Sequence, residues 1–269
     1  MSKIVLVTGG SSGLGRCICQ HLNQKGYRVY GTSRKAHNGQ MLDNFQLLKL
    51  DVADRNTIDQ AMEFLIAKEG RIDVLVNNAG ISTAGPIEEQ DMQEAKRVFE
   101  TNVWGVMNMC QAILPQMRSQ GGGQIINTSS IAGSMGLPFR SVYSASKHCV
   151  EAFTESLSME VARFNIKVSV LQPGDFNTEL NQNRTESKLT EQSVYKEVFD
   201  QQMQIVSEHM DEAMDPKILG DILQTIIEDP KPKLRYMVGP FLQKFSTVLK
   251  RVLPARTFEG ILKDHYKLL

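Results

Sequence analysis

Up to about residue 172, the chain alternates short, nearly all-apolar runs with longer segments of helical spacing. Continuous apolar runs are typical of strands in a parallel sheet, because helices cover both of its faces. This alternation predicts an α/β fold built on a doubly wound parallel sheet flanked by helices. The predicted strands are Ile4–Val7, Arg28–Thr32, Gln46–Leu50, Val74–Asn77, Gln124–Thr128 and Lys167–Leu171, and the predicted helices are Leu14–Lys25, Arg55–Lys68, Met92–Arg118 and Val142–Phe164.

The pattern changes after Pro173-Gly174. Residues 181–215 are polar and rich in Gln and Met, with helical spacing of their few apolar side chains. Because no linker, repeat or low-complexity tract separates the two parts, the sequence predicts one domain over residues 1–269. The elements expected after residue 215 are a helix at Lys217–Glu228, a strand at Leu234–Val238 and an amphipathic helix at Phe241–Leu253.

Composition and charge exclude several classes of protein. Thirty basic and thirty acidic side chains cancel, which leaves no overall attraction to nucleic acid or to an anionic membrane. No apolar run approaches the ~20 residues that span a bilayer, so no transmembrane segment is expected. The five histidines have no metal-ligand spacing, so no metal site is expected. The four cysteines form no CxxC pair, which is typical of free thiols in a reducing cytosol and predicts a cytoplasmic location.

Three glycines mark the turn from the first strand into the first helix. Gly9, Gly13 and Gly15 have the spacing G-x-x-x-G-x-G. Small residues at such a turn let backbone N–H groups approach a pyrophosphate at the positive end of the helix dipole. The alternative is a plain glycine-rich turn, because short glycine motifs recur by accident.

The end of the second strand bears on which dinucleotide binds. The 2′-hydroxyl of NAD usually meets an acidic side chain there, whereas the 2′-phosphate of NADP requires a cation. This chain has Arg34 and Lys35 and no carboxylate at that position. Arg34 can clamp a phosphate with two hydrogen bonds, and the Ser11 hydroxyl can assist. We therefore expect NADP(H) rather than NAD(H); the alternative is that both cations are simply solvated.

Tyr143 and Lys147 are four residues apart, so on a helix both point from one face. A free tyrosine titrates near pH ~10, too high for a base at neutral pH, but a nearby ammonium stabilises the phenolate. Tyr143 can then donate a proton to a ketone or accept one from an alcohol. Ser130 can hold the same oxygen while charge develops on it. Taken alone, such a Tyr/Lys pair is also common as a surface pair.

Eight short motifs or residues stand in the same order as in one known enzyme family. On these residues the chain resembles the short-chain dehydrogenases/reductases, with a match from Lys3 to Thr178. The glycine spacing differs from that of the family's extended members, which resemble T-G-x-x-G-x-x-G. The matching segments are Thr8 to Gly15 (T-G-x-x-x-G-x-G), Asp51-Val52, Asn77 to Gly80 (N-N-A-G), Asn102, Ser130 to Gly133, Tyr143 to Lys147 (Y-x-x-x-K), Pro173-Gly174 and Thr178.

The resemblance implies a role for each site residue in a hydride transfer between NADP(H) and a carbonyl or alcohol. Tyr143 would be the general acid/base, and Lys147 would tune it and bind the nicotinamide ribose. Ser130 would orient the substrate oxygen, and Asn102 would position a water that relays protons. The residues expected to bind the cofactor are Gly9, Ser11, Ser12, Gly13, Leu14, Gly15, Arg34, Asp51, Val52, Asn78, Ala79, Gly80, Tyr143, Lys147, Pro173, Gly174 and Thr178.

The resemblance also implies an organisation and an assembly. The fold would be a Rossmann-type sheet with residues 1–178 as the cofactor-binding and catalytic core. Residues 179–269 would form a C-terminal extension that covers the substrate. Family members usually pair through two long helices, here Met92–Arg118 and Val142–Phe164, which implies a homodimer or homotetramer.

Substrate choice should depend on segments that the family does not share. The candidates are Ser134–Phe139, Ile81–Ile87 and residues 181–215. Together their apolar side chains favour an apolar carbonyl or alcohol over a sugar or phosphate, although each one alone can simply pack the core. The run from Pro230 to Tyr236 and the tail resemble the hydroxysteroid and retinol dehydrogenase branch, which supports a lipophilic ketone, aldehyde or secondary alcohol. The expected pocket side chains are Met135, Leu137, Pro138, Phe139, Met203 and Val206.

The tail raises the question of membrane contact. Phe241–Leu253 would place its apolar residues on one side, and Lys244, Lys250 and Arg251 towards the other. Such a helix can bind a membrane surface. Because any surface helix shows the same amphipathicity, we expect the tail to pack on its own domain instead.

Two alternatives to an NADP(H)-dependent reductase stay open. The first keeps the chemistry and uses NAD in an alcohol dehydrogenase. The second is a non-catalytic sensor that binds the dinucleotide and reports redox state to a partner. The intact set of Asn102, Ser130, Tyr143 and Lys147 argues against the sensor, because a sensor has no need of all four.

Overall fold

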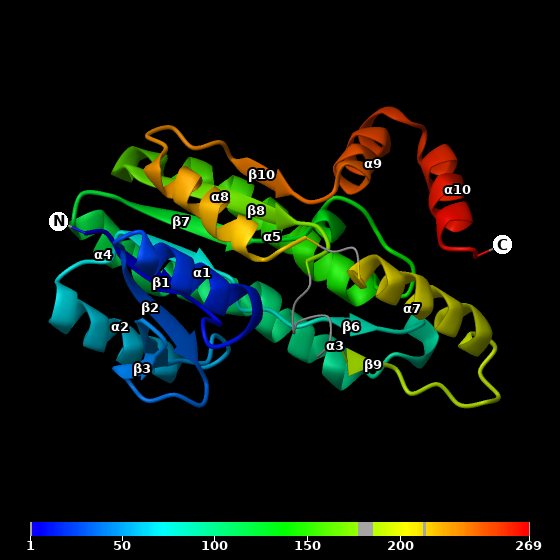
Figure 1. Ribbon diagram of the computed structural model, residues 1–269, viewed down its shortest axis with the longest axis horizontal. Helices are drawn as coiled ribbons and strands as arrows, with labels where there is room; N and C mark the ends of the chain where they lie inside the picture. Colours follow the sequence, from blue (N-terminus) through cyan, green and yellow to red (C-terminus); the bar gives the residue numbers. More distant parts are fainter. Residues whose placement is uncertain (1, 177–184, 212–213, 269) are drawn as a thin grey trace.

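A mostly parallel sheet runs through the computed structural model, which describes residues 2–176, 185–211 and 214–268 (Figure 1). The strands of this sheet are β1 (Ile4–Val7), β2 (Arg28–Ser33), β3 (Gln40–Leu42), β4 (Phe45–Lys49), β5 (Val74–Asn77), β7 (Gly123–Thr128), β8 (Ile166–Pro173) and β10 (Arg235–Val238). In the described chain their order is β10-β8-β7-β5-β1-β2-β4-β3, with β3 antiparallel to β4. A separate parallel pair joins β6 (Thr83–Ala84) to β9 (Thr185–Glu186).

Helices cover both faces of this sheet. The helices of the described chain are α1 (Gly13–Gln24), α2 (Arg55–Glu69), α3 (Met92–Phe99), α4 (Gly105–Ser119), α5 (Ser141–Val161), α7 (Lys196–Asp211), α8 (Lys217–Glu228), α9 (Phe241–Val252) and α10 (Ala255–His265), with a π-helical turn η2 (Glu100–Trp104) and 3-10 turns η1 (Ile87–Glu89), η3 (Ile131–Gly133) and η4 (Ala162–Phe164). Alternate residues of a strand point to opposite faces. Ile4 and Leu6 therefore pack with α2, α4 and α5, whereas Val5 and Val7 pack with α1 and α8. The predicted doubly wound sheet is confirmed.

The observed bounds follow the sequence signals closely. The ends of every predicted strand lie within two residues of the ends of the observed strand. Asp54 caps α2, because its carboxylate accepts a hydrogen bond from the Asn56 N–H at 3.0 Å. The pattern does not predict β3, whose three residues are too few for a periodicity and which joins β4 through a tight turn at Asp43.

The prediction of one helix over Met92–Arg118 is wrong in one respect, because η2 separates α3 from α4. The N–H of Gly105 donates to the carbonyl of Glu100, five residues earlier, and this wider spacing defines a π turn. One extra residue barely disturbs the apolar periodicity, so the sequence pattern does not reveal it. The widened turn carries Asn102.

The C-terminal helices α9 and α10 extend beyond the sheet after β10 (Figure 1). α9 forms where the pattern predicts a helix. Thr247 is its buried side chain, while Phe241, Leu242 and Val252 are 74%, 76% and 68% exposed. The tail packs on its own domain in part, because Leu249, Leu253 and Leu262 contact the buried cluster of Ile131, Met135 and Phe258, but much of the apolar side of α9 is exposed. None of the helices in the described part of the chain is both long and apolar enough to cross a membrane.

Candidate active site

A cavity of about 1120 Å³ opens at the edge of the sheet where the parallel strands end. Residues after β1, β2, β4, β5, β7 and β8 line it, together with α5 and the C-terminal helices. Asn102 is fully buried close by, and Thr178 lies outside the described residues. The sequence-predicted residues that the cavity brings together are Gly9, Ser11, Ser12, Gly13, Leu14, Gly15, Arg34, Asp51, Val52, Asn78, Ala79, Gly80, Ser130, Tyr143, Lys147, Pro173 and Gly174.

Hydrogen bonds from Thr8 fasten the glycine loop to the end of β5. The Thr8 hydroxyl accepts from the backbone N–H groups of Asn78 and Ala79, both at 3.0 Å, and its carbonyl accepts from the Asn78 side chain. The loop is packed so closely that a Cβ on Gly15 would lie 2.1 Å from the carbonyl oxygen of Gly9. Glycine is therefore required at this position, and the N-terminus of α1 faces the cavity as an anion-binding end.

Cations gather where the second strand reaches the cavity. Arg34 and Lys35 line it and are both exposed, and the Lys35 N–H donates to the Ser33 hydroxyl at 3.3 Å. Among the described lining residues the carboxylates are Asp51 and Asp175, which follow β4 and β8 rather than β2. A free guanidinium end without an acidic neighbour suits a phosphate better than a ribose hydroxyl.

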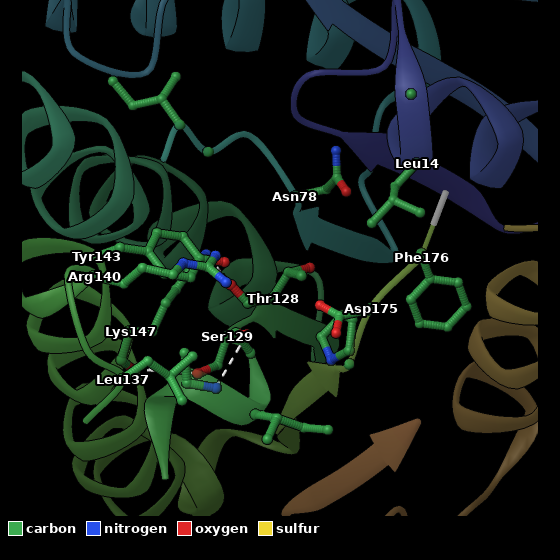
Figure 2. Close-up of a pocket in the computed structure, with 18 of the residues that line it drawn as sticks. Leu14, Asn78, Thr128, Ser129, Leu137, Arg140, Tyr143, Lys147, Asp175 and Phe176 are labelled. Atoms are coloured by element: carbon green, nitrogen blue, oxygen red, sulfur yellow. Dashed lines mark hydrogen bonds between the residues drawn. The ribbon is translucent and has the colours of Figure 1, made fainter. Parts of the chain in front are cut away.

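Tyr143 and Lys147 project from one face of α5 into the cavity (Figure 2). Both are buried, and the Lys147 Nζ lies 5.8 Å from the centre of the Tyr143 ring. The Lys147 ammonium donates to the carbonyl of Thr128 at the end of β7, at 3.0 Å. Burial lowers the pKa of the Lys147 amine, and the negative charges of the Tyr143 phenolate and Glu151 act in the opposite direction. The ammonium and the phenolate thus favour each other.

Ser130 stands at the turn that follows β7 and is the N-cap of η3. Its Oγ accepts a hydrogen bond from the Ala132 N–H at 3.2 Å, which fixes the side chain at the cavity wall. A hydroxyl that accepts in this way still carries its own proton. Ser130 can therefore donate to an oxygen bound beside Tyr143.

Asn102 ties the loop after β5 to α5. Its amide oxygen accepts from the Ile81 N–H at 2.9 Å, and its amide nitrogen donates to the Ile81 carbonyl at 2.9 Å and to the Ser146 hydroxyl at 3.1 Å. The Ser146 hydroxyl in turn donates to the Tyr143 carbonyl at 2.7 Å. The π turn thus places Asn102 where it braces the segment that carries Tyr143, and its role with a water molecule stays a prediction.

Arg140, Asp175 and Tyr266 are among the polar cavity residues that the sequence did not predict. The Arg140 guanidinium lies 4.8 Å from the centre of the Tyr143 ring, and its buried Nε has no hydrogen-bond partner (Figure 2). Burial raises the pKa of Tyr266, while the charges of Arg140 and Asp175 act on it in opposite directions. Arg140 precedes Tyr143 by three residues and Asp175 directly follows Pro173-Gly174, so both had a positional signal. Tyr266 had none.

Apolar side chains make up much of the remaining lining. Met135, Leu137 and Val206 line it as predicted, and η3, α9 and α10 add further side chains: Ile131, Leu242, Phe245, Leu249, Phe258, Ile261 and Leu262. Pro138, Phe139 and Met203 were expected there but are not among the described lining residues. Phe139 instead packs edge-on against Phe199, at 5.5 Å between ring centres, and the Pro138 carbonyl accepts from Gln202. These contacts hold the loop between η3 and α5 against α7.

In the described part of the chain no group of three or more His, Cys, Asp or Glu side chains is placed to hold a metal ion. All four cysteines are free, and Cys19 and Cys110 are buried. Burial raises the pKa of the Cys110 thiol to about 12, which makes it a poor nucleophile at neutral pH.

Comparison with known protein families agrees with this geometry. The profile described as short chain dehydrogenase matches residues 3–189, more than two thirds of the chain. The chain belongs to the short-chain dehydrogenase family. The resemblance drawn from the motifs is confirmed, and this short-chain dehydrogenase is an oxidoreductase.

Individual relatives of this short-chain dehydrogenase have a range of names. It is 40% identical over 267 residues to the 3-ketodihydrosphingosine reductase of Bacteroides thetaiotaomicron, covering 99% of this chain and 98% of that one. It is 32% identical over 259 residues to the estradiol 17-beta-dehydrogenase 1 of Rattus norvegicus, covering 87% and 73%. The predicted relation to hydroxysteroid dehydrogenases is confirmed.

Solved structures place the same fold beside a cofactor. A short-chain dehydrogenase from Streptomyces avermitilis has a TM-score of 0.81 at 30% identity, covering 100% of this chain and 97% of that one. The structure of ElxO with NADP bound has a TM-score of 0.73 at 26% identity, covering 88% and 96%. These neighbours support a nicotinamide dinucleotide as the cofactor class.

The burial of Lys147 predicts that Lys147→Met stabilises the fold. Because the folded-state pKa of this amine is lowered, the unfolded chain binds the proton more tightly, which reduces the free energy of unfolding. This penalty is full below the folded-state pKa and disappears as pH rises towards the unfolded value of ~10.4. We expect Lys147→Met to unfold at a higher urea concentration than the natural protein at pH 7, with the difference shrinking towards pH ~10.

The matched control is Lys96→Met, at an exposed lysine of α3, which should change the free energy of unfolding by less than ~0.5 kcal/mol. A loss of stability in Lys147→Met at pH 7, or a gain that does not vary with pH, would contradict the interpretation of Lys147 as a buried, desolvated amine.

Proposed function

We propose that this short-chain dehydrogenase uses NADPH to reduce the ketone of a long-chain lipid that carries an amine. The observation that carries the proposal is the position of Tyr143, Lys147 and Ser130 where two halves of one cavity meet. The glycine loop lines one half, and apolar side chains from η3, α7, α9 and α10 line the other. Ligands that occupy the two halves would meet at Tyr143.

The residues of the first half fit NADP(H). When bound, the reduced nicotinamide supplies the hydride. The loop N–H groups and the N-terminus of α1 would hold the pyrophosphate, and the Arg34 guanidinium would bind the 2′-phosphate. Asp51-Val52 would contact the adenine and Lys147 the nicotinamide ribose. Pro173-Gly174 would contact the carboxamide, with Thr178 expected to join them.

The chain's own residues would supply the proton. The Tyr143 hydroxyl would donate its proton to the carbonyl oxygen as the alcohol forms, while the Ser130 hydroxyl donates a hydrogen bond to the same oxygen. The Lys147 ammonium would stabilise the phenolate that is left. Asn102 would hold the water through which the proton is replaced.

A long-chain amino ketone would fit the second half. The apolar walls suit an alkyl chain, and the Asp175 carboxylate, which projects from the end of β8 into the pocket, provides a counter-charge for an ammonium group (Figure 2). The buried Arg140 Nε, which has no partner, suits an oxygen on the ligand. The relative named for 3-ketodihydrosphingosine supports this class, because that molecule carries an amine beside its ketone and a long alkyl chain.

The assembly and the location stay predictions. A homodimer or homotetramer would pair α4 and α5 of two copies, where the neighbouring Trp104 and Met159 are 52% and 74% exposed. A cytoplasmic location would suit the four free cysteines.

The role of Tyr143 is tested by Tyr143→Phe. Without the hydroxyl, kcat/KM for reduction of 3-ketodihydrosphingosine should fall by about 10²–10⁴-fold, because the proton donor is lost. The dissociation constant of NADPH, measured by fluorescence titration, should not change. Tyr195→Phe, at a tyrosine bound to Glu88 outside the cavity, is the control and should keep full activity. Unchanged kcat/KM in Tyr143→Phe would exclude this role, and tight NADPH binding without any turnover in the natural protein would favour the sensor.

The cofactor preference is tested by Arg34→Ala. Loss of hydrogen bonds to a charged phosphate should weaken NADPH binding by about 10–100-fold. The dissociation constant of NADH, titrated on the same variant, is the internal control and should hardly change. An equal loss of affinity for NADPH and NADH would contradict the binding of the 2′-phosphate by Arg34. Tighter binding of NADH than of NADPH by the natural protein would favour the NAD alternative.

The substrate class is tested by Asp175→Asn. The KM for 3-ketodihydrosphingosine should rise about tenfold, because a charge-assisted hydrogen bond to the ammonium becomes a neutral one. The KM for a 3-ketone of equal chain length without the amine should stay the same. If the KM rises equally for both ketones, or for neither, Asp175 does not recognise an amine.

A further inference from the structure

The helix α9 is attached to the body of the protein by its polar side. The Gln243 side chain donates to the Asp175 carboxylate at 2.6 Å and accepts from the Asp175 N–H at 3.0 Å. The Thr247 hydroxyl, on the same side, lies 3.5 Å from the sulfur of Met237 on β10. A surface helix ordinarily packs its apolar side inwards. Leu249 of α9 packs in this way, against Ile131, Met135 and Phe258, but most of the apolar side of α9 does not.

This packing leaves an apolar stripe in contact with solvent. Phe241, Phe245, Val248 and Val252 follow each other at helical spacing and are 74%, 44%, 51% and 68% exposed. The rings of Phe241 and Phe245 stack, with 5.9 Å between their centres. A continuous exposed stripe of this kind marks an interaction surface rather than chance exposure of single residues.

The charges of α9 are of one sign. Lys244, Lys250 and Arg251 are exposed, and the helix contains no carboxylate. Lys244 and Arg251 are seven residues apart, so they lie on one flank between the apolar stripe and the packed side. Cations that flank an apolar stripe are the pattern of a helix that lies in a membrane interface, with its lysines and arginines at anionic headgroups.

The stripe is continuous with the mouth of the cavity. Leu242 and Phe245 are exposed and also line the cavity, and Ile261 of α10, which is 42% exposed, lines it from the other side. An apolar molecule could therefore move from a surface that covers the stripe to the wall of the cavity along apolar side chains.

We propose that α9 docks on an anionic bilayer surface and that the apolar substrate passes between this surface and the cavity beside α9. The docking itself rests on the stripe and its charges, and only the identity of the passing molecule rests on the proposed function. A second copy of the chain is a poorer occupant, because a two-fold pairing of α9 would bring Lys244 and Arg251 of both copies together. An anionic surface complements these charges instead.

The test is co-sedimentation of the full chain with vesicles of phosphatidylcholine, alone or mixed with an equal amount of phosphatidylglycerol. We expect binding to the mixed vesicles that weakens with salt. Phe241→Ser/Val248→Ser should reduce the partition coefficient by about tenfold or more, because the buried apolar surface is lost. Lys244→Gln/Arg251→Gln should reduce it by about tenfold on mixed vesicles and have little effect on phosphatidylcholine alone. Met41→Ser, at a methionine of β3 that is 58% exposed, is the matched control and should bind like the natural protein.

The outcomes separate docking from catalysis. Neither Phe241 nor Val248 is among the described cavity-lining residues, so turnover of a short, water-soluble ketone should be the same in Phe241→Ser/Val248→Ser and in the natural protein. Turnover of a long-chain ketone supplied in mixed vesicles should fall with the partition coefficient. Vesicle binding without any ketone reduction would overturn the proposed function and leave docking in place.

Three results would overturn the docking proposal. The first is no binding of the natural protein to mixed vesicles. The second is equal binding by Phe241→Ser/Val248→Ser. The third is a natural protein that is a dimer and does not bind vesicles, together with a double variant that is a monomer. The stripe would then join two copies of the chain.

Discussion

The site depends on an ammonium group that is held out of water beside a tyrosine. Lys147 is 4% exposed, and the carbonyl of Thr128 accepts its hydrogen bond. Burial of a charge is unfavourable unless other groups compensate it. Here the negative charges of the Tyr143 phenolate and of Glu151 act against the effect of burial on the Lys147 amine.

The surrounding structure keeps this pair in place. The Ser129 hydroxyl donates to the Lys147 carbonyl, and Ser146 links the Tyr143 carbonyl to Asn102. Asn102 occupies its position because η2 widens the helix between α3 and α4. The π turn is therefore connected to the backbone carbonyl of Tyr143 through two hydrogen bonds, which gives an irregular turn a structural role within a long helix.

Parallel topology explains why the cavity has two halves. All strands that end near the site do so at one edge, which gathers the loops of the cofactor half there. The other half needs a cover, and α9 and α10 supply it from beyond β10. Because α9 is held through Gln243 and Asp175, its polar side faces inwards, and Phe241, Val248 and Val252 stay exposed.

The sequence was sufficient for the sheet, for most element bounds and for many of the residues that line the cavity, because buried parallel strands and glycine turns have strong local patterns. It was insufficient where the structure depends on one inserted residue, on the path of the tail or on the orientation of one helix. The π turn leaves the periodicity almost intact, and Tyr266 reaches the cavity through the path of the tail, which no local pattern encodes. For α9, amphipathicity showed which residues share a side but not which side is attached, because Gln243 bonds to Asp175, 68 residues earlier in the chain.

The central claim is that a hydride passes between the two halves of this cavity. Its most direct test is reduction of 3-ketodihydrosphingosine with NADPH that carries deuterium at nicotinamide C4, followed by mass spectrometry of the product. The account predicts one deuterium on the new carbinol carbon in ordinary water. A product without deuterium at that carbon, or no product while NADPH stays bound, would contradict it.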